Sequence, residues 1–320
     1  MLAMTAFVGV VGATGMLIAA RETIDSVGRI PGVAATLNPG SAGVENFLLV
    51  GSDSRAGADP ASSDASGIGT EADVSGHRSD TIMILRRDRA TGDAALLSIP
   101  RDLWVQVPGH ENKRRINSAF NDGPDILVQT LQQGDLQLPI HHYVEIDFSG
   151  FKSLVDALGG VEICVEFATR DVSTGLNITE PGCHMLDGLQ ALAYARSRHY
   201  EEYRDEVWHE DPASDLGRTK RQQEFVNLAL QTALERIKVD PFAAGRLVAA
   251  IGSSLRVDDE LDPIAAAASL RSAVDAGIAT YSLPVFGDTI GGNAVLLLGD
   301  GSDAVLAFFR GQGPAPAANA

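Results

Sequence analysis

The sequence predicts a single three-layer α/β/α domain with a central mixed sheet, preceded by one N-terminal transmembrane helix. Three observations lead to this fold class. From residue 45 onward, short apolar runs alternate with longer segments of helical pattern, as is typical of a sheet covered by helices. The apolar fraction of 45% in 320 residues is enough for a sizeable core. Residues 1–20 carry no charge at all.

The uncharged stretch ends at Arg21, the first basic residue of the chain. Twenty helical residues span about 30 Å, the thickness of the hydrocarbon core of a bilayer. A cleaved signal peptide is the alternative, but such a peptide begins with a basic region, and no Lys or Arg precedes Arg21. We therefore expect a membrane anchor over 1–20. Because basic residues favour the cytoplasmic flank, we also expect a basic extension before residue 1.

The first half of the expected domain is rich in strands. Residues 46–51 (NFLLVG) form a short apolar run typical of a strand buried on both faces. A Gly-rich polar loop is expected over 56–77, and a helix over 118–133 is interrupted at Gly123-Pro124. Three further apolar runs are expected to be strands, at 80–86, 94–99 and 103–107.

The second half alternates helices and strands. Asp147 stands as the N-cap of a helix expected at 148–158, and Asp187 is placed to cap a helical segment expected at 186–195. Residues 199–215 carry seven acidic side chains and are expected to form a loop, after which a long helix opens with Asp215 as its N-cap. The remaining predictions are strands at 142–146 and 161–166, the long helix over 216–238, and alternating elements at 241–253, 263–276, 279–285, 294–298 and 302–309.

These elements divide the chain into four parts. They are the anchor over 1–20, a juxtamembrane linker over 21–44, one domain over 45–310, and an Ala/Pro tail over 311–320. The net charge of −17 argues against nonspecific nucleic-acid binding, which needs a basic surface. A local basic site for a phosphate ligand is still compatible with it, because net charge does not decide the chemistry of a cleft.

Arginines and aspartates stand at the ends of the predicted elements. Asp53 follows the first strand in GSDSR, and Arg78 and Asp80 open the next strand in RSDT. Residues two apart on a strand point to the same side, so Arg78 and Asp80 can present opposite charges to one site. The other candidates are Arg101 in SIPRD, Arg115 before INSAF, Arg196 and Arg198 in ARSRH, and Arg218 and Gln222 near the start of the long helix.

For two of these groups, the expected secondary structure decides whether the side chains can reach the same ligand. Arg196 and Arg198 would diverge on a helix, so they share a target only if the chain straightens there. Arg218, Arg221 and Gln222, at i, i+3 and i+4, share one face of a helix. A lone surface arginine usually forms an ion pair of little energetic value. Several arginines facing aspartates instead predict a pyrophosphate site with a divalent metal, since guanidinium binds phosphate bidentately and carboxylates bind hard cations.

Seven motifs, in order, closely resemble the LytR-CpsA-Psr family. They are NFLLVGSDSR, HRSDTIMIL, LLSIPRDLWVQVPG, RRINSAF, VEIDFSGFKSLVDALGGVEI, LDGLQALAYARSRH and DLGRTKRQQEF. They cover most of residues 45–240, and the likeness is weaker after 240. The resemblance implies an α/β domain outside the membrane on one N-terminal span, with a deep apolar pocket for a polyprenyl pyrophosphate.

The resemblance also implies roles for residues. It assigns Asp53 and Asp80 to a divalent metal, Mg²⁺ or Mn²⁺, and these two are expected to be catalytic together with Arg78 and Arg101. It assigns the pyrophosphate to Arg78, Arg101, Arg196, Arg198 and Arg218, with Gln222 as a polar partner. The family often has lysine in the place of Arg115, so the positive charge is kept there.

Cys164 and Cys183 are the two cysteines. Two buried thiols are one possibility, and a disulfide is the other, which the expected export favours. The pair also resembles the one that actinobacterial members of the family carry.

The resemblance implies a metal-dependent phosphotransferase that moves a polyprenyl-pyrophosphate-linked glycopolymer onto a peptidoglycan hydroxyl and releases polyprenyl phosphate. In an actinobacterium the expected glycan is arabinogalactan. A polyprenyl-pyrophosphate hydrolase that uses the same residues is one alternative. A non-catalytic lipid- or glycan-binding regulator of wall synthesis is the other. The intact Asp53 and Asp80 count against that regulator.

Overall fold

The computed structural model describes residues 27–40, 43–52, 79–212, 214–240, 243–252, 254–269 and 277–318. The anchor predicted over 1–20 and the loop predicted over 56–77 lie outside these ranges. Within them, no helix is both long and apolar enough to cross a membrane.

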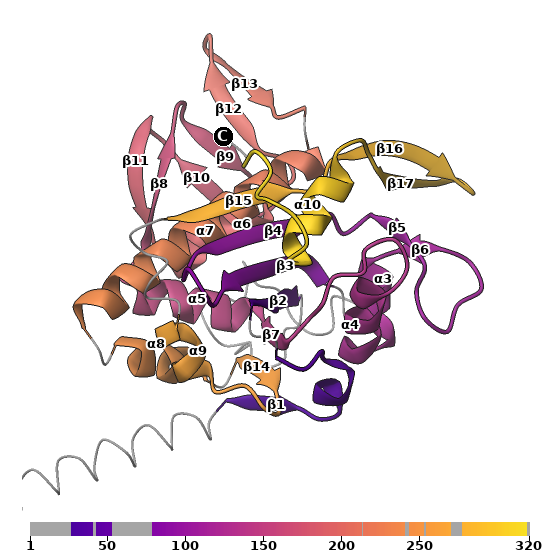
Figure 1. Ribbon diagram of the computed structural model, residues 1–320. Helices are drawn as coiled ribbons and strands as arrows, with labels where there is room; N and C mark the ends of the chain where they lie inside the picture. The colour runs from indigo at the N-terminus through magenta and orange to yellow at the C-terminus, as the bar shows by residue number, and fades with distance from the viewer. Residues whose placement is uncertain are drawn as a thin grey trace, which may run out of the picture.

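A seven-stranded mixed sheet forms the centre of the fold (Figure 1). The pairs β1/β14, β7/β2 and β4/β15 are parallel, and the other neighbours are antiparallel. This confirms the α/β class with a mixed sheet. In spatial order the strands are β1 (Gly28–Ile30), β14 (Leu255–Asp258), β7 (His142–Ile146), β2 (Val44–Ser52), β3 (Ser79–Asp88), β4 (Ala94–Ile99) and β15 (Ile278–Ser282).

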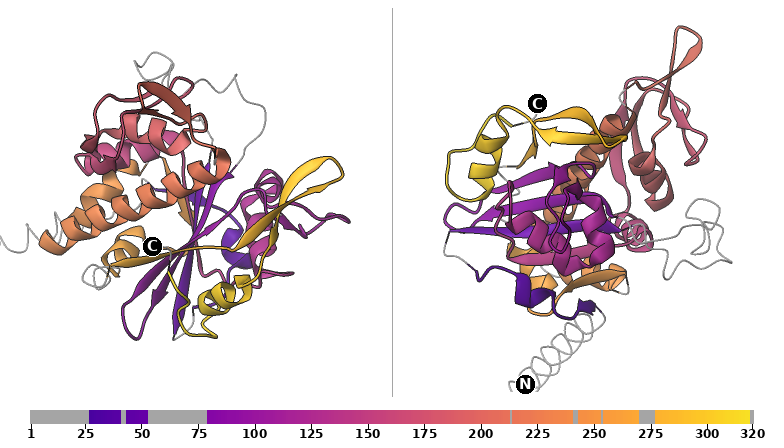
Figure 2. Two further views of the ribbon diagram at one scale, coloured as in Figure 1. Left: turned by 90° about the horizontal axis from the view of Figure 1, so that it is seen from above. Right: turned by 90° about the vertical axis from the view of Figure 1, so that its right-hand side faces the viewer.

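Helices cover both faces of this sheet (Figure 2). Successive side chains of a strand point to opposite faces, so Ile82 and Ile84 of β3 join one core cluster while Met83 and Leu85 join another. The first face packs against η1 (Val33–Thr36), α3 (Asn117–Asp122), α4 (Pro124–Gln132) and α10 (Ser302–Phe309). The second face packs against α5 (Phe148–Ala157), α7 (Ser214–Val239), α8 (Ala243–Ile251) and α9 (Pro263–Ser269), with α6 (Gly188–Arg196) behind α5 and α7.

Helix starts follow the expected chemistry in two places and depart from it in a third. The carboxylate of Asp147 accepts from the backbone N–H of Gly150 at 2.8 Å, and that of Asp187 accepts from Gln190 at 2.9 Å. Both are side-chain N-caps. The long helix begins at Ser214, so Asp215 lies inside it instead of capping it. The break at Gly123-Pro124 is confirmed, with α3 ending before it and α4 beginning at Pro124.

Part of the range predicted as a linker belongs to the sheet. Residues Gly28–Ile30 form β1, and Ile30 and Val33 are buried in the core. The segment is too short to show periodicity, and only its pairing with β14, more than two hundred residues later, makes it a strand. The strand expected at 103–107 shrinks to β5 (Trp104–Val105), because its partner β6 (Arg114–Arg115) offers only two residues.

The acidic segment expected to be a loop is a β-hairpin instead. Its strands are β12 (Glu201–Arg204) and β13 (Val207–Glu210), and they extend a four-stranded sheet in the order β10-β9-β12-β13, with β9 at Thr169–Asp171 and β10 at Leu176–Ile178. Asp205 and Glu206 have φ of 51° and 64°. Two successive residues with positive φ make the tight turn that joins twisted strands. The turn has no glycine, which is why the sequence pattern did not reveal it.

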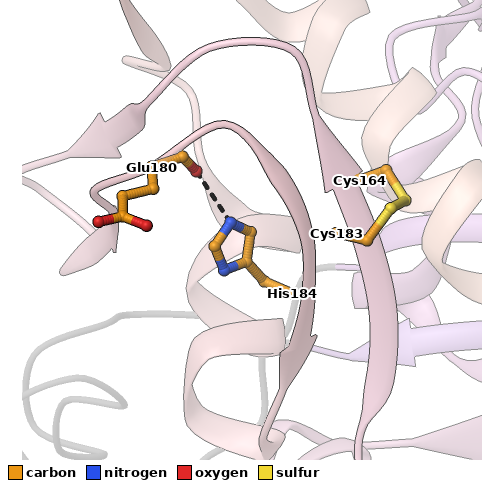
Figure 3. Close-up of a disulfide and its surroundings, with 4 residues drawn as sticks. All are labelled: Cys164, Glu180, Cys183 and His184. Carbon is orange, nitrogen blue, oxygen red and sulfur yellow. Dashed lines mark hydrogen bonds between the residues drawn. A yellow bond between two sulfur atoms is a disulfide. The ribbon is translucent and has the colours of Figure 1, made fainter.

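A disulfide joins Cys164 and Cys183 across a two-stranded antiparallel sheet (Figure 3). The two residues face each other in the register of β8 (Val161–Val165) and β11 (Gly182–Leu186), and their Cα atoms are 3.9 Å apart. Beyond the bond, the ring of His184 donates from Nε2 to the carbonyl of Glu180 at 2.8 Å. The disulfide therefore joins the two strands covalently, and the His184 hydrogen bond holds Glu180 against β11.

We expect alkylation of the unreduced protein in denaturant to modify neither Cys164 nor Cys183, and alkylation after reduction to modify both, as read by mass spectrometry. The bridge closes a loop with a sequence separation of 19. In the chain-entropy description, reduction should lower the free energy of unfolding by about 3 kcal/mol. Labelling of both thiols in denaturant without a reductant would contradict the bridge.

Candidate functional site

A cavity of about 740 Å³ lies between the sheet and the helices of its second face. Alternate residues of two strands line its floor: Phe47, Leu49 and Gly51 of β2, and Thr81, Met83 and Leu85 of β3. Four residues of a strand extend about 13 Å, so the cavity follows the strands for at least that distance. Its walls come from α5, α7 and α8, mostly through aliphatic and phenyl side chains such as Phe151, Phe225, Val226, Leu230, Val248 and Ile251.

The two ends of the cavity differ in chemistry. At the end where β2 finishes and β3 begins, Ser52 and Thr81 line it together with Arg101, which follows β4. At the other end, Phe47 and Leu85 continue into the buried apolar cluster around α8. A single cavity therefore has a polar, cationic end and an apolar end.

Five of the residues predicted from the sequence meet at this cavity. Arg101 comes from the end of β4, Arg196 and Arg198 from the end of α6, and Arg218 and Gln222 from the first turns of α7. Arg218 and Gln222 are both buried, with exposed fractions of 2% and 8%. Segments more than a hundred residues apart thus direct three groups of arginines to one place, as the phosphate interpretation requires.

The condition on Arg196 and Arg198 is met. Helix α6 ends at Arg196, and Ser197 has φ −58° and ψ 122°, outside the helical region. The chain straightens there, so both guanidinium groups reach the same cavity. The guanidinium of Arg196 also lies 4.6 Å from the centre of the Phe148 ring, a cation–π contact that orients it.

Arg115 does not line the cavity. Its Nη1 lies 3.5 Å from a carboxylate oxygen of Asp102, and the other oxygen of Asp102 lies 3.5 Å from Nε of Arg101. Arg115 is therefore linked to the cavity only indirectly, through Asp102 and then Arg101. Arg221 likewise does not line it: its Nη1 pairs with Asp211 at 2.9 Å, and its Nη2 donates to the carbonyl of Ser197 at 2.8 Å. Only two of the three residues grouped on α7 face the cavity.

The predicted metal ligands fall at the edge of the described residues. Arg78 and Asp53 lie outside them, and Asp80 is described only as part of the backbone of β3. The adjacent residues are informative, because Ser52 pairs with Ser79 across a register shift. Ser52 directly precedes Asp53, and Ser79 directly precedes Asp80. Both serine hydroxyls are buried, with no hydrogen-bond partner among the described residues. Buried oxygen donors without partners fit a hard divalent cation.

Asp171, at the end of β9, is a site residue that the sequence analysis missed. It is fully buried. One oxygen accepts from the Ser197 hydroxyl at 2.7 Å and from the backbone N–H groups of Arg198 and His199, both at 3.0 Å. The other oxygen accepts from the N–H of Ser173 at 2.8 Å and from its hydroxyl. Asp171 thus fixes two segments that line the cavity. The only local signal was a turn-like Asp-x-Ser, which is common in loops.

Burial by itself would raise the pKa of the Asp171 carboxyl, but hydrogen bonds from Ser173, Ser197 and His199 outweigh it and lower the pKa from 3.8 to about 2. The ionised carboxylate is therefore the form that binds these donors. A pKa below the unfolded value means a contribution to stability that is complete above pH 3.8 and is lost as the pH falls towards about 2.

We expect Asp171→Asn to lower the free energy of unfolding at pH 7 by about 1–3 kcal/mol, because an amide leaves some buried donors unsatisfied. The difference in the free energy of unfolding between this variant and the natural protein should become smaller as the pH falls from 3.8 to about 2, because the natural carboxylate then takes up a proton and becomes neutral like the amide. Urea unfolding at several pH values measures it, with Asp288→Asn on an exposed hairpin as the control. A difference that does not depend on pH would contradict this role.

The LytR_cpsA_psr family model matches residues 20–305. A probable cell wall biosynthesis protein, LcpB of Corynebacterium glutamicum, is 36% identical over 88% of this chain and 64% of its own. A polyisoprenyl-teichoic acid–peptidoglycan teichoic acid transferase, TagU of Halalkalibacterium halodurans, is 32% identical over 64% of this chain and 62% of its own. The chain thus spans less than two thirds of the length of either relative.

Among solved structures, a LytR-Csp2A-Psr enzyme from Actinomyces oris superposes with a TM-score of 0.66 at 25% identity. The superposition covers 83% of this chain and 89% of the other. The mixed sheet with helices on both faces is therefore a fold that this chain shares with the Actinomyces oris enzyme.

Proposed function

The chain belongs to the LytR-CpsA-Psr family, and from this premise we propose that it is a phosphotransferase acting on a lipid-linked glycopolymer. The donor is a polyprenyl-pyrophosphate-linked glycan, the acceptor is a peptidoglycan hydroxyl, and polyprenyl phosphate is released. The relative from Halalkalibacterium halodurans, named as a transferase from a polyisoprenyl carrier to peptidoglycan, supports this donor and acceptor. We propose arabinogalactan as the first glycan to test.

One observation carries the proposal: a single cavity joins a cluster of arginines to a deep apolar channel. A polyprenyl pyrophosphate has the same division, a dianionic or trianionic head on a hydrocarbon chain. Each methylene group transferred from water to an apolar wall contributes about 0.8 kcal/mol. The guanidinium groups of Arg101, Arg196, Arg198 and Arg218 suit the head, because they bind phosphate oxygens in pairs and stay charged.

The reaction requires positioning and charge neutralisation more than covalent chemistry. The acceptor oxygen attacks the phosphorus that carries the glycan, and a new P–O bond forms. The bond between this phosphorus and the bridging oxygen breaks, and the bridging oxygen leaves with polyprenyl phosphate. The hydroxyl proton passes to a carboxylate, for which Asp53 and Asp80 are the candidates. The arginines bind the negative charge that shifts to the leaving phosphate.

We propose that Asp53 and Asp80 also hold a divalent cation, Mg²⁺ or Mn²⁺. When bound, the cation would neutralise charge on the phosphate oxygens. The buried hydroxyls of Ser52 and Ser79 support a cation at this edge of the sheet. We further propose that residues 1–20 anchor the chain in the cell membrane, with the domain outside the cytoplasm. The Cys164–Cys183 bridge supports this side, since disulfides persist in oxidising compartments.

The test is a transfer assay with a synthetic polyprenyl-pyrophosphate-linked glycan and Mg²⁺, with and without a peptidoglycan acceptor. We expect polyprenyl phosphate and an acceptor-linked glycan to appear together, and only when the acceptor is present. Release of polyprenyl phosphate without linked product would identify a hydrolase. Bound lipid without any turnover would identify a binding protein and overturn the proposal.

We expect Ala229→Phe to raise the KM for a long-chain donor by about tenfold or more, because a ring placed in the cavity displaces several methylene groups. Ala229 is buried on α7 and lines the apolar part of the cavity. A donor with a short lipid should be affected less. Ala249→Phe, on the exposed side of α8, is the matched control. If Ala229→Phe raised the KM for the long-chain and the short-chain donor by the same factor, this would contradict a lipid-binding cavity.

A further inference from the structure

Arg221 is a buried arginine that the proposed reaction has not used. It lies on α7 three residues after Arg218, and only 7% of it is exposed. Arg218 lines the main cavity, whereas Arg221 does not. A buried charge costs free energy unless it is paired and hydrogen-bonded, so the contacts of Arg221 show which part of the fold it stabilises.

One contact of Arg221 is with the peptide plane that joins Ser197 to Arg198. Nη2 of Arg221 donates to the carbonyl oxygen of Ser197 at 2.8 Å. On the other side of the same plane, the N–H of Arg198 donates to the carboxylate of Asp171 at 3.0 Å. A peptide unit is planar, so a buried cation and a buried anion fix its orientation from its two edges. Hydrogen bonds to charged groups are also stronger than those between neutral groups.

This peptide plane lies where the chain leaves helix α6. The helix ends at Arg196, and Ser197 adopts φ −58° and ψ 122°. Residues two apart on a helix do not share a face, so Arg198 lines the same cavity as Arg196 only because the helix stops between them. The groups that hold the plane therefore decide whether the site contains both guanidinium groups.

Two further contacts hold Arg221 itself. Its Nη1 lies 2.9 Å from a carboxylate oxygen of Asp211, and its guanidinium lies 4.3 Å from the centre of the Tyr200 ring. Asp211 and Tyr200 flank the hairpin β12–β13 (Figure 1), and the N–H of Asp211 donates to the carbonyl of Tyr200 at 2.7 Å. Contacts with the base of the hairpin therefore fix Arg221, and Arg221 in turn fixes the segment after α6.

Gly217 gives Asp211 the room to reach Arg221. It is buried near the start of α7. A Cβ at this position would lie 2.1 Å from Oδ2 of Asp211 and 3.2 Å from Nη1 of Arg221. Alanine is favoured over glycine inside a helix, but here it would displace the carboxylate from the guanidinium group.

We propose that Arg221 is a positioning residue, which holds this peptide plane so that Arg198 and Arg196 bind the same pyrophosphate. The inference rests on the proposed function, which assigns the pyrophosphate to the arginines of the main cavity. It explains why a guanidinium group is buried beside that cavity without lining it. Asp211 positions Arg221, and Arg221 positions the arginine that contacts the substrate.

A double-mutant cycle in the transfer assay tests this inference. We expect Arg221→Ala to lower kcat/KM by about tenfold or more, because misplacing a binding group by about 1 Å can cost about a hundredfold in rate. In an Arg198→Ala protein the same change should cost less than about twofold, since the group that Arg221 positions is absent. In an Arg101→Ala protein it should cost as much as in the natural protein. Equal costs in the two backgrounds would show general damage and overturn the inference.

Two milder variants carry the same cycle if the Arg221→Ala protein does not fold. Arg221→Lys keeps the charge beside Asp211 but loses the second donor group of the guanidinium. Gly217→Ala moves the carboxylate of Asp211 and removes no charge. Both should lower kcat/KM in the natural background and have little effect in the Arg198→Ala background. Equal losses in both backgrounds would again overturn the inference.

Arg170→Ala is the matched control. Arg170 also pairs with a carboxylate, that of Glu201 at 2.6 Å, and its guanidinium lies 4.0 Å from the centre of the Trp208 ring. It belongs to the same four-stranded sheet as the hairpin but does not line the main cavity. Its loss should leave kcat/KM unchanged. A loss of activity as large as that of Arg221→Ala would overturn the assignment to Arg221.

Binding of inorganic pyrophosphate, measured by calorimetry, separates this inference from the proposed function. Arg221→Ala and Arg198→Ala should raise the Kd by similar factors, and the double variant should raise it no further. That result supports the positioning role even if no transfer to peptidoglycan is observed. Natural Kd and natural kcat/KM in an Arg221→Ala protein would overturn the role and leave the function intact. A natural protein that neither binds pyrophosphate nor transfers would overturn both.

Discussion

Replacing Arg196 or Arg218 with alanine should lower kcat/KM for transfer by about a hundredfold or more, a loss of roughly 3 kcal/mol of transition-state stabilisation. The two residues come from α6 and α7, yet both line the same cavity. Arg218 is only 2% exposed, so its charge is poorly solvated and its contacts to a phosphate are strong. Steady-state transfer kinetics measure the loss, with circular dichroism to confirm folding.

Lysine should restore only part of the activity at either position, because it keeps the charge but loses the planar pair of donors. Arg236→Ala is the matched control, since Arg236 is an exposed arginine on the same helix as Arg218 and does not line the cavity. Natural rates of transfer by folded Arg196→Ala and Arg218→Ala proteins would show that the arginines do not bind the reacting phosphates.

Replacing Asp53 or Asp80 with alanine should abolish turnover that depends on a divalent cation while leaving lipid binding in place. In the sequence Asp53 directly follows β2, and Asp80 belongs to β3; these two strands are hydrogen-bonded neighbours, with Ser52 and Ser79 paired in register. The main apolar lining lies farther along the same strands, so lipid affinity should survive. Activity measured across a titration of Mg²⁺ and Mn²⁺, beside binding of a labelled polyprenyl phosphate, separates the two effects.

Asp288→Ala serves as the control for loss of a carboxylate, because Asp288 lies on the exposed hairpin of β16 (Val285–Ile290) and β17 (Asn293–Leu298). It should retain the natural metal dependence. Full activity of an Asp80→Ala protein at every metal concentration would remove Asp80 from the site. An equal loss of lipid binding and turnover would instead indicate damage to the cavity.

Local signals in the sequence predicted many elements correctly because their causes are local. Strand β7 has the expected bounds, His142–Ile146, and the N-caps Asp147 and Asp187 accept the expected hydrogen bonds. A cap depends on residues three positions apart. The acidic hairpin was missed for a related reason: its turn uses Asp205 and Glu206 with positive φ, where glycine or asparagine is the usual signal.

In the candidate site, the order of the arginine motifs along the chain and their resemblance to the LytR-CpsA-Psr family predicted five residues that line the main cavity. They are Arg101, Arg196, Arg198, Arg218 and Gln222. The sequence could not separate Arg218 from Arg221 on one helix face. Their different contacts arise because the segment after α6 and Asp211 lie beside Arg221. Arg115 was placed with the others by charge, but it contacts Asp102 and not the cavity.

The sequence by itself determined the class of fold, the helix caps and the kind of charge available to a site, since these follow from residue types at short spacing. Only the tertiary structure decided that the arginines share one cavity with an apolar channel, that Asp171 holds the segment carrying Arg198, and that β1 joins the sheet. These features join residues tens to hundreds of positions apart. Their energies depend on burial and on pairing across the fold, and no local pattern records either one.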